Sequence, residues 1–106
     1  MKILPRDYTA LVLKRKQAFL DWLKEADRRA MSENDHDFAG DYGTYLVKIV
    51  STTSEIENFL RNHFKTLFEN ELREWHEPEF WPEDISYELF CQWFEVEVHR
   101  QVYEVG

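Results

Sequence analysis

The chain has 106 residues, a formal net charge of −8 at pH 7, 43% hydrophobic residues and 16% aromatic residues. This length suits a single domain over residues 1–106, and the hydrophobic and aromatic content argues against a disordered chain despite the net charge. The single cysteine, Cys91, excludes an internal disulfide and a cysteine zinc cluster, and we expect its thiol to be buried.

The chain also lacks the features of a membrane protein. No stretch approaches the roughly 20 apolar residues that a membrane-spanning helix needs, and the first residues lack the apolar run of a signal peptide. We therefore expect a soluble, cytoplasmic protein that does not bind membranes.

The first third of the chain predicts a strand followed by a helix. Residues 8–13 are rich in strand formers, and their nearly continuous apolar character indicates a central strand with both faces covered. The helix that follows ends near Arg28 and Arg29, where cations favour the negative end of the helix dipole. Together these elements look like the first half of a crossover unit.

A polar loop and a second strand come next. Residues 32–43 hold two of the three glycines, so we expect this segment to be a mobile loop. Residues 44–50 are again β-branched and aromatic, which predicts the second strand.

The longest predicted element is a helix from Ser54 to Trp75. Ser54 and Glu57 fit a capping box at its start. Apolar side chains then recur every three or four residues, the period of one helix face, at Ile56, Phe59, Leu60, Phe64, Leu67, Phe68, Leu72 and Trp75. Such a stripe is wide enough to dock on a sheet.

The C-terminal third starts with a break. Pro78 and Pro82 force an extended connection, and Ser86 can cap a shorter helix. Residues 96–105 fit either a strand or a continuing helix, and their β-branched content favours a third strand. The order strand, helix, strand, helix, helix, strand predicts an α+β (or small α/β) fold, with helices packed on a three-stranded sheet.

Charge is unevenly distributed along the chain. Residues 1–30 hold eight Lys and Arg against four Asp and Glu, whereas residues 31–106 hold five against seventeen. A surface of this kind repels nucleic acid and attracts either a basic protein or the chain's own basic first third. Direct binding of DNA or RNA is therefore not expected.

Three groups of residues are candidate sites. Lys14, Arg15 and Lys16 precede a predicted helix N-terminus and could hold an anion there. No glycine-rich nest accompanies them. The alternative is that they pair with the acidic C-terminal half, within the fold or between subunits. Acidic residues surround two aromatic residues in the proline-bracketed connection, which is the composition of a partner-binding hot spot or of a packed plug. This group comprises Phe80, Trp81, Glu77, Glu79, Glu83 and Asp84.

The third candidate is a metal site. Glu95, Glu97 and His99 would share one face of a strand, and divalent metals accept carboxylate and imidazole ligands. The spacing is not that of the HExxH motif, and an acidic chain places acids near histidines by chance, so the alternative is a surface histidine paired with a carboxylate.

Three patterns resemble a family of small uncharacterised bacterial cytoplasmic proteins with no assigned activity. They are Lys14-x-Lys16-x-x-Phe19-x-x-Trp22-Leu23, Phe68-Glu69-x-Glu71-Leu72-x-x-Trp75, and Trp81-Pro82 followed by Phe90-x-x-Trp93-Phe94-x-x-x-x-His99-x-x-Val102-Tyr103. The resemblance covers most of the chain, implies a compact cytoplasmic domain and supplies no catalytic residues.

Two classes of function follow from these observations. The first is a non-enzymatic acidic module that binds a basic protein, as an inhibitor, an immunity or antitoxin-like partner, or a mimic of nucleic-acid charge. The alternative is a small metal-dependent or acid–base enzyme that uses His76 or His99 with nearby glutamates. We expect no catalytic nucleophile and no cofactor, and a homodimer is compatible with either class.

Overall fold

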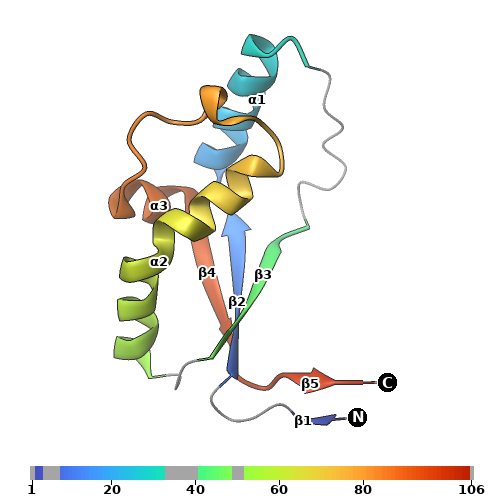
Figure 1. The fold of residues 1–106 in the computed structure, drawn as a ribbon, viewed down its shortest axis with the longest axis vertical. Coiled ribbons are helices and arrows are strands. Elements are labelled where there is room, and N and C mark those ends of the chain that lie inside the picture. Colours follow the sequence, from blue (N-terminus) through green and yellow to red (C-terminus); the bar gives the residue numbers. More distant parts are fainter. Residues whose placement is uncertain (1, 4–7, 33–40, 49–51, 106) are drawn as a thin grey trace.

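The computed structural model describes residues 2–3, 8–32, 41–48 and 52–105 (Figure 1). It confirms the predicted α+β fold and the predicted order of the main elements. In chain order these are β1 (Lys2–Ile3), β2 (Tyr8–Arg15), α1 (Gln17–Arg29), β3 (Gly43–Lys48), α2 (Thr53–Arg73), the 3₁₀ turn η1 (Pro78–Phe80), α3 (Tyr87–Trp93), β4 (Phe94–His99) and β5 (Tyr103–Glu104). Most of the loop predicted over residues 32–43 lies outside the described residues.

The main sheet has the strand order β3-β2-β4, and both pairs are antiparallel. The crossover unit predicted from the first strand and helix is therefore wrong, because β3 returns beside β2 in the opposite direction. Residues 96–105 are strand rather than helix, as expected, but the segment is divided. β4 starts at Phe94, and Tyr103–Glu104 leaves the main sheet to pair with β1.

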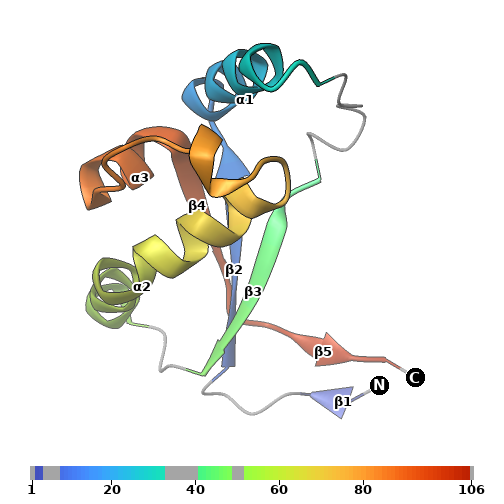
Figure 2. The same cartoon turned by 45° about the horizontal axis from the view of Figure 1, so that its top comes forward.

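Helices α2 and α3 lie on one side of this sheet, to the left of the strands in Figures 1 and 2, and α1 lies above the upper end of β2. Leu11 and Leu13 of β2 point to that side and are fully buried, and Val47 and Phe94 from the neighbouring strands are also buried there. No described helix packs on the other side, where Leu46 is 53% exposed. The expectation that both faces of the first strand are covered is therefore wrong.

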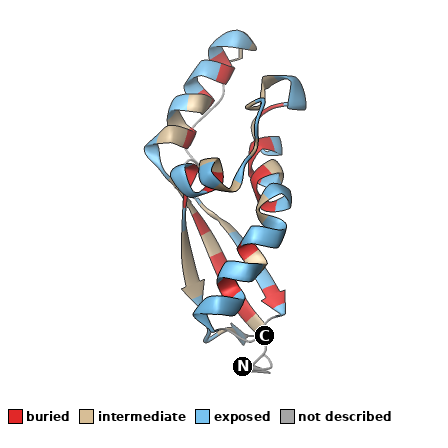
Figure 3. Ribbon diagram, turned by 90° about the vertical axis from the view of Figure 1, so that its left-hand side faces the viewer, coloured by how far each residue is buried: buried red, intermediate tan, exposed pale blue. Residues whose placement is uncertain are grey.

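Helix α2 buries one face in the core, and Figure 3 shows its buried residues as patches between exposed ones. The apolar period predicted this face correctly, since Leu60, Phe68 and Leu72 are all buried. Phe68 packs with its ring centroid 5.2 Å from those of both Trp93 and Phe94. The helix thus joins β4 and α3 to one aromatic core.

The ends of the helices agree with the sequence except at one cap. Ser86 accepts a hydrogen bond from the Leu89 amide at 3.1 Å and caps α3 as predicted. At α2, however, the cap is Thr52, whose hydroxyl accepts from the Glu55 amide at 3.2 Å, so the capping box proposed at Ser54 is wrong. Within the described residues, no helix combines the length and the apolar character needed to cross a bilayer.

Candidate functional site

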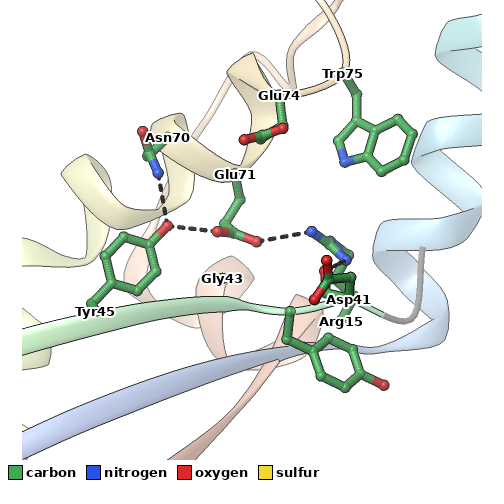
Figure 4. Close-up of a pocket in the computed structure, with 9 residues that line it drawn as sticks. Arg15, Asp41, Gly43, Tyr45, Asn70, Glu71, Glu74 and Trp75 are labelled. Carbon is green, nitrogen blue, oxygen red and sulfur yellow. Dashed lines mark hydrogen bonds and ion pairs between the residues drawn. The ribbon is translucent and has the colours of Figure 1, made fainter. Parts of the chain in front are cut away.

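An open cavity of about 430 Å³ lies where the C-terminal end of α2 passes over the ends of β2 and β3 (Figure 4). All three elements contribute side chains to it, and the turn after α2 adds two more. The lining residues are Arg15, Asp41, Tyr42, Gly43, Tyr45, Asn70, Glu71, Glu74 and Trp75.

A buried ion pair forms the floor of the cavity. The Arg15 and Glu71 side chains are 5% and 2% exposed, and Arg15 Nη2 lies 3.4 Å from Glu71 Oε1. Arg15 Nη1 also donates to the carbonyl oxygen of Asp41 at 2.9 Å. The guanidinium group lies 5.5 Å from the ring centroid of Phe19 and 5.9 Å from that of Trp75. Arg15 is therefore surrounded by carboxylate, carbonyl and aromatic groups, all of which stabilise a cation.

A chain of hydrogen bonds reaches Glu71 from the other side. Asn70 Nδ2 donates to the Tyr45 hydroxyl at 2.9 Å, and that hydroxyl donates to Glu71 Oε2 at 2.5 Å. Burial, followed by this bond to Glu71, raises the pKa of Tyr45 well above its ordinary value. Tyr45 therefore stays protonated at physiological pH and acts here as a permanent hydrogen-bond donor to Glu71.

Burial also raises the pKa of Glu71 above its ordinary value of 4.5, although the bond from Tyr45 and the charge of Arg15 act in the opposite direction. Gly43 provides the space that this carboxylate occupies. A Cβ atom on Gly43 would lie 2.1 Å from Glu71 Oε2, well inside van der Waals contact. The Glu71 carboxylate can therefore hold this position only while residue 43 is glycine, because a Cβ atom there would force it to move.

The raised pKa of Glu71 predicts a pH-dependent contribution to stability. The folded state binds this proton more tightly than the unfolded state, so the stabilisation is complete below pH 4.5 and is lost as the pH rises through the folded pKa. Glu71→Gln, which mimics the protonated carboxyl group, should therefore gain stability relative to the wild type between pH 4 and 7. Urea unfolding at several pH values measures this difference, and ¹³C NMR of the Glu71 carboxyl should give a midpoint above 4.5. A lower midpoint would contradict this assignment.

The three cations proposed as an anion site are not brought together. β2 extends to Arg15, two residues further than predicted, so Lys14 and Arg15 alternate to opposite faces of the sheet. Lys14 pairs with Glu97 at 3.2 Å on the open face, whereas Arg15 enters the cavity. Lys16 Nζ donates to the carbonyl oxygen of Cys91 at 2.9 Å. Each cation thus has its own partner in the C-terminal half of the chain.

Glu95, Glu97 and His99 do share one face of β4, and this face is directed away from the helices. His99 Nε2 lies 2.5 Å from Glu97 Oε1, and this bond, followed by the contact with Lys14, lowers the pKa of Glu97. The same contact raises the pKa of Lys14. Across the described parts of the chain, no group of three or more His, Cys, Asp or Glu residues is arranged to hold a metal ion.

The two aromatic residues of the proline-bracketed connection are partly buried. Trp81 packs against the core and its indole nitrogen donates to the carbonyl oxygen of His76 at 2.8 Å. The carbonyl oxygen of Phe80 accepts from the Trp22 indole at 2.9 Å. These contacts match the packed plug more closely than an exposed anchor. The four acids around them, by contrast, are all exposed: Glu77, Glu79, Glu83 and Asp84.

The structure places His76 in a buried hydrogen bond and Cys91 at the surface. His76 is buried, and its Nε2 atom lies 2.6 Å from Asp27 Oδ1, which ties α1 to the connection after α2. Cys91 is exposed, so the prediction of a buried thiol is wrong. Residue 91 follows the fully buried Phe90 on α3 and falls on the solvent side of that short helix.

Sequence analysis missed the residues that form the cavity, with Arg15 as the exception. One signal for Glu71 was present, because this residue is four positions from both Leu67 and Trp75 and therefore lies on the apolar face of α2. An acid on such a face must find a buried partner. Tyr45 and Gly43 gave no comparable signal, since their role depends on the register between β3 and β2.

Comparisons with protein-family models, with curated proteins and with solved structures gave no match. The fold and the cavity define the chain as a small α+β protein with an acidic, aromatic-lined site. The family resemblance inferred from sequence patterns stays a prediction.

Proposed function

We propose that this chain is a non-enzymatic acidic interaction module that binds a basic protein partner in the bacterial cytoplasm, as an inhibitor or as an immunity or antitoxin-like protein. The observation that carries this proposal is a run of unpaired negative charge, which we call the acidic segment. Its side chains are all exposed, and they are Glu74, Glu77, Glu79, Glu83, Asp84 and Glu88.

The acidic segment has little internal compensation. No Lys or Arg occurs between residues 74 and 99, and none of the six acids forms an ion pair with another described residue. Two cations lie nearby, since Arg29 and Arg73 are placed over the rings of Phe80 and Trp81 at 5.7 and 5.4 Å. They offset only part of the negative charge.

Three other described cations of the first third are engaged elsewhere. Lys14 and Arg15 pair with Glu97 and Glu71, and Arg28 pairs with Glu25. These three cations therefore neutralise other parts of the molecule and not the acidic segment. A field of one sign that is left uncancelled at the surface accelerates encounter with a partner of the opposite sign.

Affinity capture with the immobilised protein tests the proposal. We expect a basic protein to be retained at low ionic strength and released between about 50 and 300 mM salt, because screening shortens the range of surface charges. The variant Glu79→Gln/Glu83→Gln/Asp84→Asn, which removes three charges from the acidic segment, should no longer retain this basic protein.

A matched control separates the acidic segment from net charge. The variant Asp21→Asn/Glu55→Gln/Glu57→Gln removes the same amount of charge from exposed positions outside the segment, and it should retain the same partner. If both variants lose the partner equally, net charge rather than the acidic segment determines binding. If retention of the partner does not depend on salt, the proposal is contradicted.

A second candidate is an acid–base enzyme, and one observation favours it. Glu71 is a buried carboxyl group with a raised pKa beside an open cavity, which is a common arrangement for a general acid. A Glu71 carboxyl that titrates at its ordinary value would remove the only support for this candidate.

A further inference from the structure

We propose that the cavity between α2, β2 and β3 receives one cationic side chain of the basic partner, the ammonium group of a lysine or the guanidinium group of an arginine. This inference rests on the proposed function and deepens it. The cavity and the acidic segment are continuous in space, because Glu74 belongs to both. A cation drawn to the segment therefore meets the cavity at its rim.

The hydrogen bonds within the site determine the kind of ligand that fits. The donors point inward, since Asn70 Nδ2 is used by Tyr45, the Tyr45 hydroxyl is used by Glu71, and Arg15 is engaged by Glu71 and the Asp41 carbonyl. Acceptors remain. These are the carboxylates of Glu74 and Asp41, which lie on exposed residues and take part in none of these bonds within the site, whereas Glu71 Oε1 is buried against Arg15. A ligand that donates hydrogen bonds therefore suits these acceptors.

The charges of the cavity lining also favour a cationic ligand. Arg15 and Glu71 neutralise each other, which leaves the carboxylates of Glu74 and Asp41, both on exposed residues, as the net charge of the site. An anion would meet these two carboxylates and an arginine already surrounded by acceptors. A cation would instead gain two carboxylates in a partly enclosed space, where their attraction is screened less than at a flat surface.

The aromatic lining suits an organic cation in particular. Figure 4 shows the Glu74 carboxylate and the Trp75 indole on the same side of the cavity, above the Glu71–Arg15 pair. A ring face beside a carboxylate binds alkylammonium and guanidinium groups through the ring quadrupole as well as through charge. The volume of about 430 Å³ lies within the range of roughly 300–1,000 Å³ found for small-ligand sites.

Titration of ¹⁵N-labelled protein with single blocked amino acids tests the inference. The cationic probes are N-acetyl-arginine methylamide and N-acetyl-lysine methylamide, and N-acetyl-citrulline and N-acetyl-norleucine methylamides are the neutral probes of similar shape. We expect the indole N–H signal of Trp75, assigned with Trp75→Phe, to shift with the cationic probes and not with the neutral ones. Comparison of the two cationic probes separates the ammonium from the guanidinium group.

Two variants with the same change of charge locate the effect. Glu74→Gln should weaken the cationic probes about three- to fivefold, which is the usual effect of losing one partly exposed charge. Glu55→Gln, which lies outside both the cavity lining and the acidic segment, should leave their affinity unchanged. Equal weakening by both variants, or an equal response to N-acetyl-citrulline methylamide, would overturn the inference.

A nine-residue oligolysine peptide separates the two proposals. If the peptide binds in a salt-dependent manner through the acidic segment while the Trp75 signal does not respond to any probe, the cavity inference fails and the interaction module stands. If neither the peptide nor a cationic probe binds, both fail. Binding of N-acetyl-aspartate methylamide at Trp75 would assign the opposite sign to the cavity and overturn the inference.

Discussion

Replacing Arg15 with methionine is expected to destabilise the protein by about 2–3 kcal/mol at pH 7 and by about 1 kcal/mol or less at pH 5. Methionine preserves much of the apolar volume of the side chain, so the change isolates the lost charge. Glu71 is only 2% exposed and would lose its cationic partner. It must then stay buried as an unpaired anion or take up a proton.

Protonation sets the upper limit of this cost. Keeping a carboxyl group neutral costs about 1.4 kcal/mol for each pH unit above its ordinary pKa, which is 4.5 for Glu71. The folded pKa of Glu71 rises further without Arg15, so the variant is least stable at high pH and recovers as the pH falls. Urea unfolding of both proteins between pH 4.5 and 7.5 measures this convergence.

The double variant Arg15→Met/Glu71→Gln is the control. A neutral amide needs no counter-ion and can still accept from the Tyr45 hydroxyl, so the second change should restore most of the stability lost at pH 7 and abolish its pH dependence. A cost of Arg15→Met that is the same at every pH would show that packing, rather than the buried ion pair, is what Arg15 contributes.

Replacing Gly43 with alanine is expected to cost about 1–3 kcal/mol, the usual range for overpacking a tight contact. The new Cβ atom would lie 2.1 Å from Glu71 Oε2 and 3.2 Å from Cε2 of Tyr45. The carboxylate would have to move, and its 2.5 Å bond from the Tyr45 hydroxyl would lengthen or break. Chemical denaturation gives the free energy, and the titration of Tyr45, whose raised pKa depends partly on this bond, should shift downward.

A double-mutant cycle checks that the clash with Glu71 is the cause. In a Glu71→Ala background the obstructing carboxylate is absent, so Gly43→Ala should cost much less than in the wild type. Thr44→Ala, at the adjacent exposed position of β3, should change stability by less than about 1 kcal/mol. If Gly43→Ala costs the same with and without the Glu71 carboxylate, the proposed role of Gly43 is wrong.

Sequence patterns predicted those helices and strands whose buried residues recur at a regular spacing. Apolar residues recur every three or four positions along α2, and members of this series such as Leu60, Phe68 and Leu72 are buried, which is why the face of α2 was predicted correctly. The same logic separated the final strand from a helix, because the β-branched residues of β4 favour extended backbone. What these patterns do not contain is strand direction, and the crossover prediction failed for that reason.

The cavity depends on details that periodicity does not record. Lys14 and Arg15 look like one basic cluster until the end of β2 is known, and the two extra strand residues then place them on opposite faces. The bond between Tyr45 and Glu71 joins residues 26 positions apart and requires the register of β3 against β2. The two-residue strands β1 and β5 are too short for any sequence pattern to reveal.

The pairing of β1 with β5 has a practical consequence for measurements on this protein. Lys2 is paired with Glu104 and Ile3 with Tyr103, so both ends of the described chain emerge side by side, below the main sheet in Figure 1 and far from η1. A fluorophore, a biotin or a sensor surface attached at either end would leave the opposite pole facing solution. Orientation on a chip is therefore under the experimenter's control, and an energy-transfer pair carried on the two ends would report separation of β1 from β5 without modifying the acidic segment or the cavity.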